Sequence, residues 1–400
     1  MKKVLVIGVL ALGLTMFAQE ITHETMVVNI EVPVRVLKGG NFIDSLTIDD
    51  FEVFEDGVPQ RIEAVYLIKK KSIERREEKT RFLPETSRNF YLFFEITEYT
   101  GKVGDALDYF INNVMVPGDN LTVVTPMKTY RMKSETFDVL SKEQIQNQFV
   151  KILRRDTLEG SAEYRNAVNE LTGLAKALSS GSNSQDEFGT AEYDGLELDV
   201  QIMMYADLLK RLEQVRMVDQ KKLLEFAEYL KDKEGQKYVF FFYQREYIPQ
   251  IDQRTMNQYM SLNQDREDIL HSLTELFSFY RRDITFDIDI VKQAYADSSV
   301  AIHFLFFAKP ADIVPGVHME EHSEDIYNAF KEIAEATGGL TESSNNPLSL
   351  FQNAVEASEN YYLLYYSPKN FMKDGKFKEI KVRVKDQNYK IFHRSGYFAD

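Results

Sequence analysis

The chain of 400 residues contains no cysteine. This excludes disulfides, a thiol nucleophile, a thiolate metal site and a lipid-modified cysteine. Positive charge is also scarce, because 48 Lys and Arg stand against 63 Asp and Glu, a formal net charge of −15. Nucleic acids and anionic membranes attract positive surfaces, so this composition disfavours both as partners. It favours proteins, cations or basic surfaces instead.

A G-x-S-x-G nucleophile elbow is also absent from the sequence. The serines of SSGSNS lie in a polar, low-complexity stretch without a neighbouring base, so acyl transfer is not supported. With 44% hydrophobic residues the chain can nevertheless bury a large core, and its length predicts two or three domains.

The N-terminus, MKKVLVIGVLALGLTMFAQE, has the layout of a secretory signal peptide. Two lysines precede an apolar run from Val4 to Phe17, and small Ala18 comes before polar Gln19. The run is short for a membrane span. We therefore predict an exported protein, periplasmic, cell-surface or secreted, with a signal peptide at 1–18 and no membrane span after cleavage. The large side chain of Met16 near the expected cut leaves an uncleaved anchor as the alternative.

The rest of the chain divides by its hydrophobic pattern. Alternating apolar residues from Met26 to Val36 and an Asp56-Gly57 turn between two strands indicate a small β unit. Mixed charges then predict a solvated linker, and the tail returns to alternating strands. The predicted units are an N-terminal β module at 20–68, a charged linker at 69–87, an α/β domain at 88–358 with a flexible loop at 179–195, and a C-terminal β segment at 359–400 that packs with the N-terminal module.

Short, continuous apolar runs alternate with helical patterns inside the α/β domain. The runs are Tyr91–Phe94, Leu121–Val124, KYVFFFYQ ending at Gln244, and VAIHFLFFA from Val300. Such runs are typical of parallel strands covered on both faces. The predicted fold class is therefore α/β, with a doubly wound, mainly parallel sheet. In sheets of this kind ligands bind at the carboxyl ends of the strands, where Glu95 to Thr100 lie.

Several motifs, in order, resemble the bacterial exported branch of the von Willebrand factor type A family. DSLTIDDFEVFEDGVPQRI is similar to the amino-terminal signature of that branch. EIAEATGG, YYLLYYSP, DGKFKEIKVRVK and RSGYFA resemble its closing segment. The resemblance covers nearly the whole chain after the signal peptide. It implies a Rossmann-like A domain joined to a β-sandwich-like module that is built from both ends of the chain.

The resemblance also implies a metal-ion-dependent adhesion site. In the family this site takes Asp-x-Ser-x-Ser from a first loop, a Thr from a second and an Asp after a later strand. On this chain the first loop falls on Glu95, Thr97 and Tyr99, the second on Ser161 in EGSAEY, and the last position on Gln244. Each of these residues departs from the family pattern.

The departures weaken the predicted metal site. Mg²⁺ requires oxygen ligands at about 2.0–2.1 Å, which the longer Glu95 meets only if the backbone moves. Tyr99 holds its oxygen across a ring, and Gln244 offers an oxygen without charge. Ca²⁺, at about 2.3–2.6 Å, or an inward turn of Glu98 offers partial compensation. We predict a degenerate site at Glu95, Thr97, Ser161 and Gln244, with no cofactor, or alternatively Mg²⁺ or Ca²⁺.

Other segments suggest rival chemistries. HMEEH, His318 to His322, matches the H-x-x-E-H pattern of zinc peptidases, although the upstream VPG and the following Ser323 favour a solvated loop. TGKVGD has the glycines and lysine of a phosphate loop but the wrong spacing. An aromatic run could form a sugar-binding platform, although a buried strand explains it more simply: Tyr361, Tyr362, Tyr365, Tyr366. A basic strip could bind an acidic partner, although a solvated strand face explains it more simply: Lys381, Arg383, Lys385.

The sequence thus predicts an exported, non-enzymatic interaction protein. Its strand-end loops near Thr97, Ser161 and Gln244 are expected to lie side by side, with Glu98, Tyr99 and Thr100 contacting a protein partner. The alternatives are a zinc-dependent hydrolase that uses HMEEH and a purely structural component of the cell envelope.

Overall fold

The computed structural model describes residues 28–400 except 71, 79–81, 83, 85–86, 134, 181–192, 194, 280–284, 309–313, 315–316, 370 and 386–387. The predicted signal peptide and most of the predicted loop at 179–195 lie outside the described residues. Among the helices that are described, none has the length and apolar character needed to cross a membrane.

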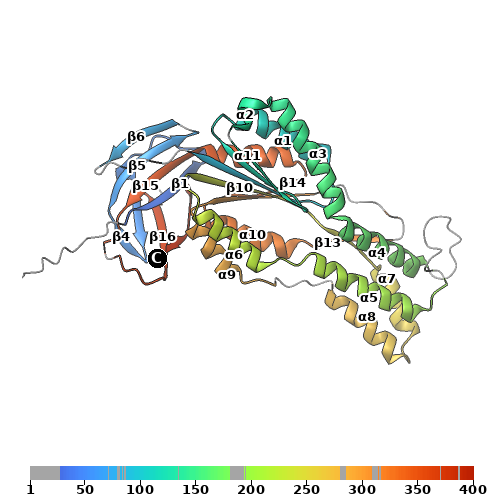
Figure 1. The fold of residues 1–400 in the computed structure, drawn as a ribbon. Helices are drawn as coiled ribbons and strands as arrows, with labels where there is room; N and C mark the ends of the chain where they lie inside the picture. The colour runs from blue at the N-terminus through green and yellow to red at the C-terminus, as the bar shows by residue number, and fades with distance from the viewer. Residues whose placement is uncertain are drawn as a thin grey trace, which may run out of the picture.

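A six-stranded sheet forms the centre of the molecule (Figure 1). Its strand order is β14 (Thr341–Ser344), β12 (Ala301–Phe307), β10 (Gln236–Gln244), β7 (Arg88–Glu95), β8 (Asn120–Val124) and β9 (Thr129–Met132). The first five strands pair in parallel, whereas β9 pairs antiparallel to β8. The sheet is therefore mixed.

Both faces of this sheet are covered by helices because its inner strands are apolar on both sides. On one face Phe90, Leu92 and Phe94 pack against α1 (Gly101–Tyr109), the π-helical turn Phe110–Val114, α3 (Lys142–Gly160) and α11 (Pro347–Glu359). On the other, Tyr91 packs with α6 (Gln220–Lys231), α9 (Ile288–Asp297) and α10 (Glu324–Ala336). Alternate residues of β7 thus belong to different cores.

A helical arm extends from the carboxyl ends of the central strands (Figure 1). It contains α4 (Ala162–Ser180), α5 (Leu198–Val215), α7 (Gln253–Leu262) and α8 (Glu267–Phe279), with its own apolar core. The short strands β11 (Tyr247–Gln250) and β13 (His318–Glu321) pair at its base. A short helix, α2 (Thr136–Val139), precedes α3.

The two ends of the chain share a pair of antiparallel sheets. One has the order β17 (Lys390–His393), β1 (Ile30–Lys38), β15 (Asn360–Tyr366), β5 (Ile62–Lys69) and β6 (Ser72–Glu78), and β2 (Asn41–Phe42) pairs with β1. The other has the order β18 (Gly396–Phe398), β16 (Phe377–Val384), β3 (Phe51–Glu55) and β4 (Val58–Gln60). They curl around one core that includes Val32, Val53, Tyr362 and Val382 (Figure 1).

The predicted fold class is wrong. Of the fourteen strand pairings described, ten are antiparallel and four are parallel. The chain is mixed α/β with mostly antiparallel sheets, and its ends form a curled antiparallel half-barrel. It is neither a doubly wound, mainly parallel sheet nor that sheet joined to a β-sandwich. The apolar runs revealed the parallel strands, whereas the more polar edge strands β6 and β9 gave no such signal.

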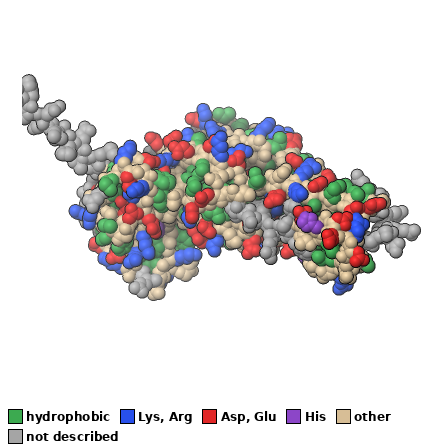
Figure 2. Space-filling view, turned by 90° about the horizontal axis from the view of Figure 1, so that it is seen from below, with side chains coloured by type: hydrophobic (Ala, Val, Ile, Leu, Met, Phe, Trp, Pro, Cys, Tyr) green, Lys and Arg blue, Asp and Glu red, His purple; other side chains and the backbone are tan. Residues whose placement is uncertain are grey.

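Acidic and basic side chains are interspersed over the face of the molecule drawn in Figure 2, and its described part shows no continuous basic patch. Interspersed charges of both signs make a surface hydrophilic without giving it a strong positive potential. Within the predicted linker, Ser72–Glu78 forms the edge strand β6.

Candidate functional site

A cavity of about 470 Å³ opens at the carboxyl ends of β7 and β10. All four residues of the predicted metal site line it: Glu95, Thr97, Ser161 and Gln244. The strand register explains this, since Tyr243 of β10 lies directly opposite Glu95 of β7, so the two strands end at the same level. Ser161 arrives from the C-terminal end of α3. Aromatic side chains form part of the remaining wall, together with aliphatic and charged residues: Phe93, Tyr164, Phe226, Phe241, Tyr243, Tyr295, Phe330.

Gln244 ties the first loop to β10. Its Oε1 accepts hydrogen bonds from Thr97 N (3.0 Å), Thr97 Oγ1 (3.0 Å) and Glu98 N (2.9 Å). Its Nε2 donates to the Glu98 carbonyl (3.2 Å). The two backbone N–H groups can only donate, which fixes the orientation of the amide. With 1% of its surface exposed, Gln244 is an internal cross-link of the loop.

The hydroxyl groups of Ser161 and Thr97 at the cavity also form hydrogen bonds within the protein. Ser161 is buried, and its Oγ donates to the Ile96 carbonyl over 3.0 Å. Thr97 Oγ1 donates its proton to Gln244, so three donors already converge on the amide oxygen that the metal-site prediction assigns to a cation. Across the described residues there is no group of three or more His, Asp or Glu arranged to hold a metal ion. This donor set does not fit Mg²⁺ or Ca²⁺ without breaking these bonds.

Glu95 faces the cavity from the end of β7. Its side chain is exposed, because it borders the open cavity. No hydrogen bond or ion pair to its carboxylate occurs among the described residues. Burial, with a further contribution from Glu246, raises the pKa of Glu95 to about 7. The cavity therefore contains one acid whose charge is not compensated.

Glu246 differs from Glu95 because its charge is paired. Arg216, at the end of α5, forms an ion pair with it, and the two side chains are 6% and 9% exposed. Tyr243 donates its hydroxyl proton to Glu246, and Arg216 also donates to the His322 carbonyl. This network joins α5, β10 and the segment after β13, so it fixes the polar part of the cavity wall, which we call the polar wall.

The three residues predicted to contact a partner lie on the loop above the cavity. Glu98 is exposed. Tyr99 is half-buried, with its ring 4.8 Å from the guanidinium carbon of Arg154 and its hydroxyl over Gly104, where an added Cβ would lie 2.3 Å away. The Thr100 carbonyl accepts from Val103 N (3.1 Å) at the start of α1. Tyr99 and Thr100 thus have structural roles, and Glu98 is the most accessible of the three.

The HMEEH segment was expected in a loop, and this is wrong. Residues His318–Glu321 form β13, antiparallel to β11. Four residues of extended strand span about 13 Å, whereas the peptidase motif needs both histidines on adjacent turns of a helix. His322 follows the strand, and its Nε2 lies 2.6 Å from Gln250 Nε2. This geometry gives no support to a zinc hydrolase.

The other rival motifs have structural roles. Gly101 starts α1, and Lys102 Nζ donates to the Asn345 carbonyl (3.3 Å). The four tyrosines of the aromatic run are at most 6% exposed, so they form buried strand rather than a sugar platform. Lys381 and Arg383 are exposed on one face of β16, and Lys385, which is also exposed, directly follows the strand.

The residues of the polar wall were not predicted. Glu246 lies two positions beyond the expected ligand Gln244, in YQRE, and could have been included as a second acid at the strand end. Arg216 gave no signal, because it lies within a region, Leu196 to Lys231, that the pattern predicts as helical throughout. The structure breaks that region between α5 and α6.

Comparison with known proteins identifies no family. No family model matches the chain, and no curated protein does. A search of solved structures returned the human COPII-coat protein Sec24c, with 6% sequence identity and a TM-score of 0.27. The match covers 80% of this chain but 44% of Sec24c, so this chain spans less than half of that protein. A similarity this weak does not establish a shared fold.

Proposed function

We propose that the chain is an exported, non-enzymatic interaction protein whose strand-end cavity receives a positively charged group of a protein partner without a metal ion. The observation that supports this most directly is Glu95, an exposed acid without an ion-pair partner at a cavity that is partly lined by aromatic rings. A lysine or arginine side chain supplies both the missing charge and an apolar stem. Its cation also interacts favourably with faces of aromatic rings such as Phe241 and Tyr243.

The internal bonds of Gln244 support binding by a preformed site. They order the loop before any partner arrives, so less conformational entropy is lost on association. The net charge of −15 adds long-range attraction for a basic partner. The resemblance to the exported branch of the von Willebrand factor type A family belongs to this proposal, with the amide of Gln244 taking over the loop-ordering role of the cation.

Selection from a library of random peptides tests the proposal. Peptides are selected on the purified chain in EDTA, and the enriched sequences are measured by fluorescence anisotropy. We expect Lys or Arg flanked by apolar residues, and at least tenfold weaker binding to Glu95→Gln, because the counter-charge is lost. Glu170→Gln, which neutralises an exposed acid on α4, is the matched control and should bind normally.

Three outcomes contradict the proposal. They are enriched peptides without a basic residue, equal affinity for Glu95→Gln and the wild type, and binding that appears only when Mg²⁺ or Ca²⁺ is added.

A further inference from the structure

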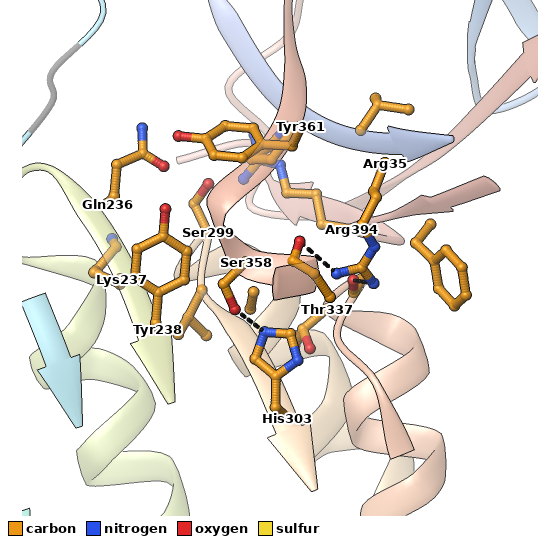
Figure 3. Close-up of a pocket in the computed structure, with 17 residues that line it drawn as sticks. Arg35, Gln236, Lys237, Tyr238, Ser299, His303, Thr337, Ser358, Tyr361 and Arg394 are labelled. Atoms are coloured by element: carbon orange, nitrogen blue, oxygen red, sulfur yellow. Dashed lines mark hydrogen bonds between the residues drawn. The ribbon is translucent and has the colours of Figure 1, made fainter. Parts of the chain in front are cut away.

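A second, smaller pocket of about 50 Å³ lies between the terminal β sheet and the central sheet (Figure 3). It lies at the amino end of β10, whereas the strand-end cavity lies at the carboxyl end of the same strand. Arg35 of β1 lines one side and Lys237 of β10 the other. Arg394, between β17 and β18, and His303 of β12 complete its polar wall.

Three cationic side chains are buried around this pocket. Arg35 is 5% exposed, and Lys237 and Arg394 are each 7% exposed. Within the described part of the chain, these three side chains form no ion pair with a carboxylate. Charged groups are almost never buried without a partner, because their desolvation is so unfavourable. Three such cations in one place therefore need an explanation.

Backbone carbonyl groups satisfy only part of the hydrogen-bonding capacity of these three side chains. Arg35 donates to the carbonyls of Ala357 (2.9 Å) and Gly338 (3.2 Å), and Lys237 Nζ donates to the Leu230 carbonyl (2.9 Å). The Nε atoms of Arg35 and Arg394 are buried and bond to no described residue. Carbonyl oxygens accept these protons but bring no negative charge.

The electrostatic state of the pocket agrees with an excess of positive charge. Burial lowers the pKa of Arg35 to about 10 and that of Lys237 to about 8, and Arg394 lowers the pKa of Lys237 further. Burial also lowers the pKa of Arg394. Glu342, Glu31 and Asp297 act in the opposite direction from beyond contact distance.

His303 contributes no charge. Its Nδ1 accepts from Leu340 N (3.3 Å), which places the ring proton on Nε2, 2.9 Å from Ser358 Oγ. The Ser358 hydroxyl in turn donates to the Ala354 carbonyl (2.6 Å). Burial, followed by the repulsion of Arg35, lowers the pKa of His303 well below its ordinary value. The positive charge of the pocket thus comes from Arg35, Lys237 and Arg394.

We propose that this pocket binds a small tetrahedral oxyanion, phosphate or sulfate, between Arg35, Lys237 and Arg394. One water needs about 10–15 Å³ of such volume, so the pocket has room for a few waters or one oxyanion and is too small for a nucleotide. An oxyanion supplies both the negative charge and acceptors for the unpartnered Nε atoms. Because the three residues come from both parts of the molecule, the bound anion joins the half-barrel to the central sheet.

Isothermal titration calorimetry of the full chain with sodium phosphate, at constant ionic strength in chloride buffer, tests this proposal. We expect saturable binding at one site, competition by sulfate, and no competition by glucose 6-phosphate, which exceeds the pocket. Lys237→Met should weaken phosphate binding at least tenfold. Lys381→Met, which removes an exposed cation of β16, is the control and should bind as the wild type does.

Thermal melts separate specific binding from general salt effects. Saturating phosphate should raise the melting temperature of the wild type by about 2–5 °C and that of Lys237→Met by less than 1 °C. An equal rise in both proteins is a general effect of the salt and overturns the proposal. So do the absence of saturable heat, unchanged phosphate affinity in Lys237→Met, and equal binding of glucose 6-phosphate, which indicates a surface site.

Discussion

Replacing Gln244 with leucine tests whether this side chain orders the strand-end loop. The change keeps a similar volume but removes the acceptor of three hydrogen bonds, from Thr97 N, Thr97 Oγ1 and Glu98 N. A typical hydrogen bond contributes about 1 kcal/mol net, and a buried donor left unsatisfied costs about 1–3 kcal/mol. Glu98 is exposed and Thr97 only half-buried, so water can replace part of the loss. We expect Gln244→Leu to lower the free energy of unfolding by about 2–3 kcal/mol.

Urea unfolding followed by circular dichroism measures this change, provided that the m-value is unaltered. Thr97→Val is the matched control, because it removes only one of the three donors, the Thr97 hydroxyl, and leaves both backbone donors bonded to Gln244. We expect it to cost less than about 1 kcal/mol. The reasoning is refuted if both variants are equally destabilised, or if Gln244→Leu unfolds at the same urea concentration as the wild type.

Three further results are expected. After EDTA treatment, millimolar Mg²⁺ or Ca²⁺ should leave the melting temperature unchanged, since the rim oxygens are bonded internally; a rise of several degrees would contradict this. Asp119→Ala should destabilise the chain by about 3–5 kcal/mol in urea unfolding, because it leaves Arg88 buried without its two-point partner (3.1 and 2.6 Å), and a loss below about 1 kcal/mol would be inconsistent with that pair. For Glu95 the folded pKa, about 7, lies above the ordinary value of 4.5, so its contribution to stability is fully present below pH 4.5 and is lost as the pH rises through 7. Glu95→Gln should remove that part of the pH dependence between about pH 4.5 and 7, and an unchanged profile would show that the group does not titrate there.

The interior of the central sheet could be predicted from the sequence because its physical signal is local. KYVFFFYQ and YLFF are continuous apolar runs, and such runs are stable only with both faces covered. Parallel pairing of β7 and β10 then places Glu95 and Gln244 at one edge, which is why the predicted site residues converge on one cavity.

The remaining strands could not be predicted because their stability comes from distant partners. β9 and β13 are short and partly polar, and they are strands only because β8 and β11 offer them backbone hydrogen bonds. β6 is a run of charges that pairs along the edge of β5. They account for three of the ten antiparallel pairings described, and the sheets formed by the two ends of the chain supply the other seven.

The hydrogen bonds and ion pairs of the site could also be predicted only in part from the sequence. In the metal-binding pattern, glutamine is not the expected ligand at position 244. The structural role of Gln244 is to accept hydrogen bonds from Thr97 and Glu98, which lie more than 140 residues away in the sequence. The same applies to Arg216 and Glu246, whose pairing follows from the break between α5 and α6. Residue types in a pattern indicate which groups are available, whereas their partners are set by the fold.

Strand β1 lies between β15 and β17, so one of the first strands of the chain has both main neighbours among the last. During synthesis on the ribosome, β1 therefore emerges long before either neighbour, and only β2 and the 3₁₀ turn that follows are near it in sequence. A stop codon anywhere before residue 360 removes both neighbours and exposes the apolar side of β1. Products truncated before residue 360 therefore lack both of these neighbours and should be open to proteases at β1.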